Sequence, residues 1–105
     1  MLLVLCTFPH RERARQIGTL LVEKQLAACV NLIPGVESIY RWEGKVEAAG
    51  EVLGIFKTTP GAYPQFKAAL SEAHPYEIPE IIAVKPEDVA PSYAAWVAAS
   101  VRADQ

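Results

Sequence analysis

Two apolar-rich segments, Val36–Trp42 and Lys45–Thr58, are separated only by Glu43-Gly44, and this arrangement restricts the fold more than any other feature of the chain. A two-residue connection of this kind predicts a β-hairpin, in which Gly44 supplies the positive φ of the turn. A fully extended strand over 45–58 would span about 46 Å at roughly 3.3 Å per residue. A chain of 105 residues forms a globule only about 34 Å across. The hairpin must therefore bend or project.

A projecting hairpin would leave apolar side chains and strand edges uncovered. Its exposed residues would include Ile39, Tyr40, Trp42 and Val46. Open edges and apolar patches promote pairing with other chains. We therefore expect neighbouring copies of this chain to cover the hairpin in a homo-oligomer.

The remaining segments alternate between strand and helix patterns. Short apolar runs predict strands over 1–8, 26–33 and 79–84, and Pro34-Gly35 predicts a bulge or bend before the hairpin. Apolar residues at helical spacing predict helices from Arg11 to about Gln25, from Tyr63 to the residue before His74, and from Pro91 onward. The order is β-α-β-β-α-β with an extra C-terminal helix, which predicts one α+β, ferredoxin-like domain over 1–105, with helices on one face of an antiparallel sheet.

Composition excludes several classes of protein. The chain is 51% apolar and 21% charged with a net charge of −2, which excludes a disordered chain, a collagen and a coiled-coil rod. The mildly acidic balance argues against nucleic-acid binding.

No segment is long enough to span a membrane, and the apolar N-terminus lacks the basic region of a signal peptide, so we expect a cytoplasmic protein. Cys6 and Cys29 have no zinc-finger spacing and are expected to be reduced thiols.

Catalytic signatures are absent, and we expect no enzyme. The chain contains no nucleophile-elbow, zinc-protease, Walker or dinucleotide-binding motif. Acid–base catalysis by His74 and Glu77 would still lack an activated nucleophile.

Three residues could bind a metal ion: Cys29 through a thiolate, His74 through an imidazole and Glu77 through a carboxylate. Such a mixture of sulfur, nitrogen and oxygen ligands suits copper or zinc. Each residue also has an ordinary structural alternative: a small buried side chain for Cys29, a loop-capping ring for His74 and a solvated carboxylate for Glu77. Both interpretations stay open.

Three aromatic residues and a lysine form a second candidate set: Tyr40, Trp42, Tyr76 and Lys57. Apolar walls and a cation could together line a cleft for an anionic ligand. The alternative is packing between subunits, because aromatic side chains are enriched in interface cores.

Four motifs then resemble those of the CutA family of divalent-cation tolerance proteins. They are Leu26-Ala-Ala-Cys29-Val-Asn, Ser38-Ile-Tyr-Arg-Trp-Glu-Gly-Lys45, Glu51 followed by Lys57-Thr58, and His74-Pro-Tyr-Glu77-Ile-Pro-Glu80. The resemblance extends from Cys6-Thr7 to the last helix. It departs at Gly18, where the family is expected to have alanine.

The resemblance implies a ferredoxin-like subunit in a homotrimer built by strand pairing, like that of the PII signalling proteins. It also implies a role in tolerance to copper and other divalent cations, with copper binding. By motif position, Cys29 and His74 would be metal ligands, whereas Tyr40, Trp42, Lys57, Tyr76 and Glu77 would line the cleft between subunits.

The motifs and the resemblance together indicate two alternative functions. The first is a homotrimeric cytoplasmic protein that binds copper or another divalent cation and contributes to metal tolerance. The alternative is a PII-like regulator that binds a small anionic metabolite in the inter-subunit cleft and signals to a protein partner. Neither involves nucleic acid or a membrane.

Overall fold

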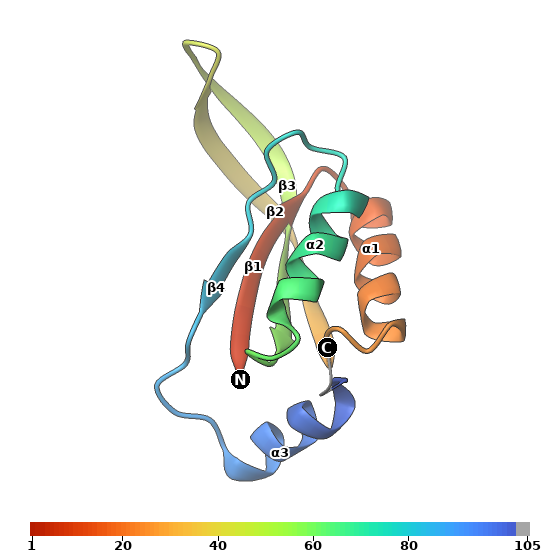
Figure 1. Cartoon of the computed structure of the whole chain (residues 1–105). Coiled ribbons are helices and arrows are strands. Elements are labelled where there is room, and N and C mark those ends of the chain that lie inside the picture. Colours follow the sequence, from red (N-terminus) through yellow and green to blue (C-terminus); the bar gives the residue numbers. More distant parts are fainter. Residues whose placement is uncertain (103–105) are drawn as a thin grey trace.

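A single antiparallel sheet organises the chain. The structure, a computed structural model, describes residues 1–102. Its elements are β1 (Leu2–Phe8), α1 (Arg11–Glu23), β2 (Cys29–Trp42), β3 (Lys45–Thr58), α2 (Tyr63–Ala73), β4 (Ile82–Val84) and α3 (Pro91–Ser100) (Figure 1). The sheet order is β2-β3-β1-β4. The α+β, ferredoxin-like order and the extra C-terminal helix agree with the sequence-based prediction.

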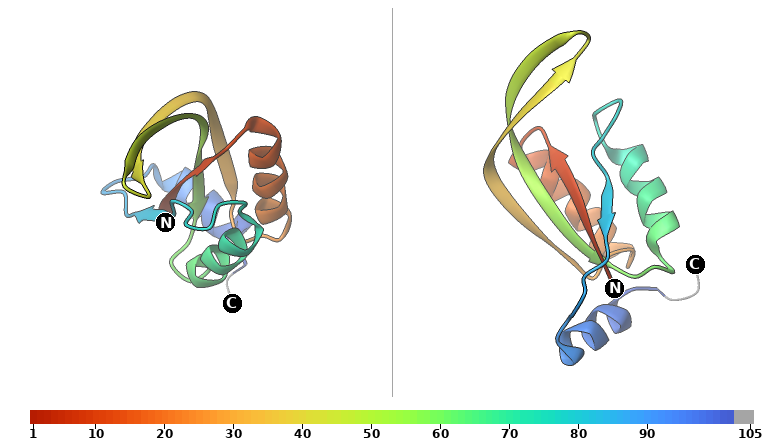
Figure 2. Two further views of the ribbon diagram at one scale, coloured as in Figure 1. Left: turned by 90° about the horizontal axis from the view of Figure 1, so that it is seen from above. Right: turned by 90° about the vertical axis from the view of Figure 1, so that its left-hand side faces the viewer.

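The hydrophobic core lies between the sheet and helices α1 and α2, which cover one face of it (Figures 1 and 2). Alternate residues of a strand point to opposite faces, so β1 contributes Val4, Cys6 and Phe8 to this core. The helices meet these residues with apolar stripes at helical spacing. The stripes consist of Ala14, Ile17 and Leu21 from α1 and Phe66 and Leu70 from α2.

Gly18 permits a close approach between α1 and β2. A Cβ atom at this position would lie 3.0 Å from Cγ1 of Val30. The departure from the family's expected alanine therefore has a packing reason, since a methyl group here would press on the strand.

Three predicted boundaries differ from the structure. α1 ends at Glu23 because Gln25 takes a positive φ of 59°, a conformation that a helix cannot include. The second strand begins at Cys29 rather than residue 26, and residues 26–28 are buried in the connection. β4 covers only Ile82–Val84 instead of 79–84, and Pro79 has no N–H to donate to a sheet.

The predicted irregularity at Pro34-Gly35 is confirmed as a register shift inside a continuous β2. Ile33 pairs with Leu53, whereas Val36 pairs with Glu51. Leu53 and Glu51 point to the same face of β3, and their partners in β2 point to that face as well. Odd-numbered residues of β2 therefore point to this face before the bulge, and even-numbered residues point to it after the bulge. Tyr40 and Trp42 consequently point to the face of the sheet that α1 and α2 leave uncovered, which we call the open face.

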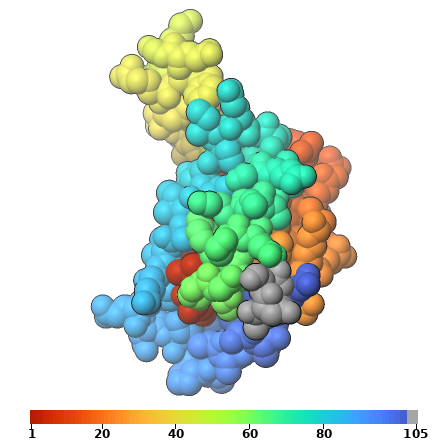
Figure 3. All heavy atoms as spheres, in the orientation of Figure 1, coloured from red at the N-terminus to blue at the C-terminus, as the bar shows by residue number. Residues whose placement is uncertain are grey.

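The hairpin formed by β2 and β3 both curves and projects beyond the rest of the subunit (Figures 2 and 3). The chain measures 44 × 26 × 23 Å. Ile39 and Val46 near the tip are 70% and 66% exposed. The expectation that the hairpin bends or projects is therefore confirmed.

No helix within residues 1–102 is long and apolar enough to cross a membrane.

Candidate functional site

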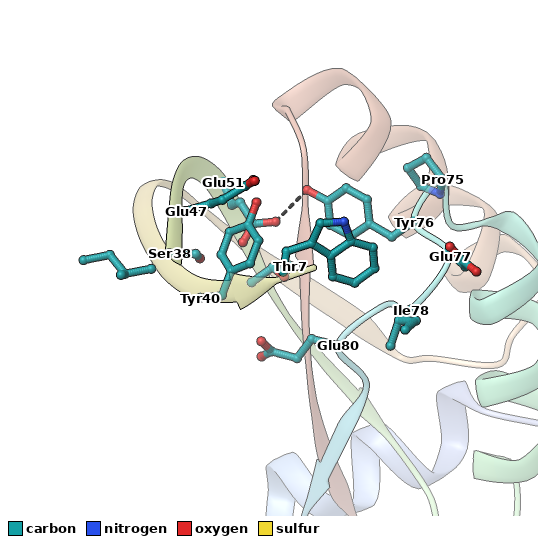
Figure 4. A pocket seen from close by; sticks show the side chains of 12 residues that line it. Thr7, Ser38, Tyr40, Glu47, Glu51, Pro75, Tyr76, Glu77, Ile78 and Glu80 are labelled. Carbon is teal, nitrogen blue, oxygen red and sulfur yellow. Dashed lines mark hydrogen bonds between the residues drawn. The ribbon is translucent and has the colours of Figure 1, made fainter. Parts of the chain in front are cut away.

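A cavity of about 750 Å³ lies between the hairpin and the loop that joins α2 to β4 (Figure 4). β1 contributes one lining residue, and the hairpin and the loop contribute the rest. The lining consists of Thr7, Ser38, Ile39, Tyr40, Trp42, Glu47, Glu51, Pro75, Tyr76, Glu77, Ile78 and Glu80. It includes four of the residues singled out from the sequence: Tyr40, Trp42, Tyr76 and Glu77.

His74 anchors the loop wall of the cavity to β1. Its Nε2 lies 2.8 Å from the carbonyl oxygen of Thr7, and its Nδ1 accepts a 3.1 Å hydrogen bond from the backbone N–H of Tyr76. The ring also stacks on Phe8, with centroids 5.1 Å apart. These contacts require a neutral ring that donates from Nε2. Burial lowers the pKa of His74, which favours that neutral form.

A hydrogen bond crosses the cavity between the loop and β3. The hydroxyl of Tyr76 donates to Oε2 of Glu51 over 2.6 Å (Figure 4). Burial, and then this bond to a carboxylate, raise the pKa of the Tyr76 phenol. Tyr76 therefore remains a neutral donor that holds one wall of the cavity against the other.

The charges around the cavity are all negative. The acidic lining residues are Glu47 and Glu51 on β3 and Glu77 and Glu80 on the loop. Neither lysine nor arginine belongs to the described lining. The cavity thus combines aromatic walls with carboxylates on two sides.

Cys29 and Lys57 lie at the other end of the sheet. They pair across β2 and β3, level with Leu3 of β1. The Lys57 ammonium donates to Oδ1 of Asn31, and the sulfur of Cys29 lies 3.4 Å from the hydroxyl of Tyr93 on α3. The hydrogen bond to Cys29 raises the pKa of Tyr93.

The three predicted metal ligands do not converge within one subunit. His74 contacts the backbone of Thr7 on β1, whereas Cys29 lies level with Leu3 of the same strand. Thr7 and Leu3 are four residues apart, a distance of about 13 Å along a strand. Both ring nitrogens of His74 are already in hydrogen bonds. Within residues 1–102, no three histidine, cysteine, aspartate or glutamate residues are grouped to hold a metal ion.

Several lining residues, among them Glu47 and Thr7, were not predicted from the sequence. Glu47 pairs with Tyr40 across the hairpin, and counting back from the Glu43-Gly44 turn would have placed these two side chains together. Thr7 holds the loop through its backbone oxygen, a contact that no side-chain pattern could reveal.

Comparison with known proteins gives a consistent result. The family model described as CutA1 divalent ion tolerance protein matches residues 2–100. The divalent-cation tolerance protein CutA of Thermus thermophilus is 46% identical over 94 residues, which covers 90% of this chain and 91% of that protein.

Solved structures agree with this match. The divalent cation tolerance protein (Cut A1) from Thermus thermophilus superposes with a TM-score of 0.93 at 43% identity, over 97% of this chain and 100% of that one. The periplasmic divalent cation tolerance protein CutA from Archaeoglobus fulgidus superposes with a TM-score of 0.92 at 35% identity, over 97% and 100% of the two chains.

Proposed function

Because the chain belongs to the CutA1 divalent ion tolerance family, we propose that it takes part in tolerance to divalent cations as a homotrimer that binds copper or another divalent cation. The observation that carries this proposal is the family match over residues 2–100, which includes every motif discussed above. We propose binding rather than turnover, because the family is described by tolerance to divalent ions and not by a reaction.

The sheet supports assembly through its two edges. The order β2-β3-β1-β4 leaves β2 and β4 as edge strands. Ile82 and Val84 of β4 are 48% and 42% exposed, and the edge strand β2 carries the projecting hairpin. Pairing β2 of one copy with β4 of the next would be a head-to-tail contact, which closes into a ring when the rotation permits. A ring of three is the state that the family resemblance implies.

Metal binding is assigned first to Cys29. Its thiol is partly exposed, whereas Cys6 is buried in the core, and a thiolate suits copper(I). His74 can bind an ion only by giving up one of its two hydrogen bonds, while the exposed Glu77 can turn toward an incoming ion. Since these donors are apart in one subunit, the complete ligand set would come from more than one copy.

Anaerobic titration with copper(I) against a competing chelator tests this assignment. We expect thiolate-to-copper charge-transfer absorption that disappears in Cys29→Ala, together with at least a tenfold loss of affinity. Cys6→Ala is the matched control, because it removes the other thiol, and it should bind as the unmodified protein does. Unchanged affinity in both Cys29→Ala and His74→Ala would remove these residues as ligands.

The alternative of a PII-like regulator for a small anionic metabolite gains no support from the cavity. Lys57, the cation expected to hold such a ligand, pairs with Asn31 at the other end of the open face. The cavity itself presents four carboxylates, which repel an anion. A thermal-shift screen with citrate and ATP tests this alternative, and a stabilisation that depends on Lys57 would restore it.

We also propose a cytoplasmic location. Cys6 and Cys29 are both free, as thiols remain in a reducing compartment. The relative from Archaeoglobus fulgidus is described as periplasmic, so cell fractionation with an antibody to this chain is the appropriate test.

A further inference from the structure

Lys57 carries a positive charge on an apolar part of the open face. Phe56 of β3 points into the core, so the next residue, Lys57, points to the open face. Its neighbours there, Leu3 and Ile55, are apolar, and only 8% of Lys57 is exposed. The ammonium group donates to the amide oxygen of Asn31. Because this amide is neutral, the contact leaves the charge of Lys57 unbalanced.

Glu51 is in the matching situation at the other end of the same face. It lies six residues before Lys57 on β3, so it points to the same side of the sheet, and it is half-buried. Its Oε2 accepts the hydrogen bond from the neutral Tyr76 hydroxyl, which leaves Oε1 available to a second donor. Neither lysine nor arginine belongs to the described lining of the cavity beside it. Glu51 and Lys57 therefore each have a neutral partner.

These two ions cannot meet within one chain. Six residues of a strand span about 20 Å, whereas the two charged groups of an ion pair lie within about 4 Å of each other. Any counter-charge that one of them supplies to the other must come from a second copy.

The edges of the sheet indicate how a second copy can supply it. The edge strands β2 and β4 are different segments, so pairing between them is head-to-tail and brings different ends of two copies together. Covering the open face also removes the remaining water from Lys57, and a buried charge without a partner is strongly destabilising. Opposite charges at the two ends of the face favour this orientation over one that brings like charges together.

We propose that Lys57 of one copy forms an ion pair with Glu51 of the next copy, so that each contact in the ring joins the Asn31–Lys57 end of one open face to the Tyr76–Glu51 end of another. This inference rests on the homo-oligomer of the proposed function and adds the residues that orient it. It does not depend on copper or on Cys29.

Sedimentation equilibrium in increasing urea, on the copper-free protein, tests the pair through two variants. Lys57→Met removes the ammonium group, and Glu51→Gln can still accept the Tyr76 hydrogen bond. Each single variant leaves the opposite ion buried without a partner, so we expect association to weaken at least tenfold per interface. The double variant removes both ions and should recover most of this loss.

Mixing the two single variants shows whether the pair joins different copies. After joint refolding, a mixed ring contains an interface with both ions and an interface with neither, whereas every interface of a single variant has one unpaired ion. We therefore expect the mixture to remain associated at a higher urea concentration than either variant alone. A pair within one chain would give no such gain.

Glu47→Gln is the matched control, because Glu47 is an exposed carboxylate on the same strand and the same face. Its effect should add to that of Lys57→Met. The proposal is overturned if Lys57 is coupled as strongly to Glu47 as to Glu51, if the effects of Lys57→Met and Glu51→Gln are additive, or if mixing gives no gain. A monomeric unmodified chain would overturn the homo-oligomer as well, whereas additive effects in a stable oligomer would remove only the ion pair.

Discussion

His74 is a buried, neutral ring that fastens the α2–β4 loop to β1. Burial lowers its pKa from 6.5, and the positive charge of Arg13 acts in the same direction, while the Thr7 carbonyl and Glu51 oppose the shift. The unfolded chain therefore binds a proton at His74 more readily than the folded chain does. By linkage, the free energy of unfolding falls as the pH drops below about 6.5.

We predict that lowering the pH from 7.5 to 5.5 destabilises the protein and that His74→Gln removes part of this dependence. Urea unfolding at fixed protein concentration measures both effects. His10→Asn is the control, because the side chain of His10 only caps α1 through the Arg13 N–H, and asparagine can take over that role. An equal pH dependence in His74→Gln and the unmodified protein would contradict the account.

The two cysteines should react very differently with thiol reagents. Cys6 is fully buried, and burial raises its pKa to about 12. In the Cys29→Ala variant, where Cys6 is the only thiol, we predict that maleimide labels the folded protein no faster than it unfolds. Mass spectrometry should show complete labelling in denaturant, and rapid labelling of the native protein would place Cys6 outside the core.

At the scale of elements, Gly18 sets the distance between α1 and β2. Alanine favours a helix by up to about 1 kcal/mol relative to glycine, but its methyl group would lie 3.0 Å from Val30 Cγ1. Valine is stiff about χ1, and overpacking costs about 1–3 kcal/mol. We predict that Gly18→Ala destabilises the unmodified protein but stabilises the Val30→Ala variant, as measured by a double-mutant cycle in urea. The same sign in both backgrounds would contradict this explanation.

The elements that could be predicted from sequence are those specified by local patterns. Helical spacing located α1 and α2, and Glu43-Gly44 located the hairpin turn. The bulge was predicted from Pro34-Gly35, but its consequence was not, because the face on which Tyr40 and Trp42 lie depends on counting register through the bulge.

The candidate site could be predicted only in part for a related reason. Tyr76 and Glu77 lie next to each other in sequence and both line the cavity. Lys57 and Cys29 belong to the same strands as the cavity residues of the hairpin, yet the strands are long enough to place them at the far end of the sheet. Residue type indicated the chemistry, whereas distance along a strand decided which residues meet.

At the scale of the whole molecule, the subunit leaves much apolar surface uncovered. Ile33, Ile82 and Val84 on the open face are all exposed large apolar side chains, and Ile39 and Val46 add further apolar surface on the hairpin that projects beyond the core (Figure 3). Exposed apolar side chains of this kind, beside two open sheet edges, mark a site of association. The same surface is the one on which neighbouring copies would contribute ligands to a shared metal site.

Sedimentation equilibrium of the purified chain at micromolar concentration tests the central claim, which is that copies of this subunit cover one another's open faces and edges. We predict a single species of about three times the 11.5 kDa subunit mass, which dissociates when aspartate replaces both Ile82 and Val84. A stable monomer at these concentrations would contradict the account.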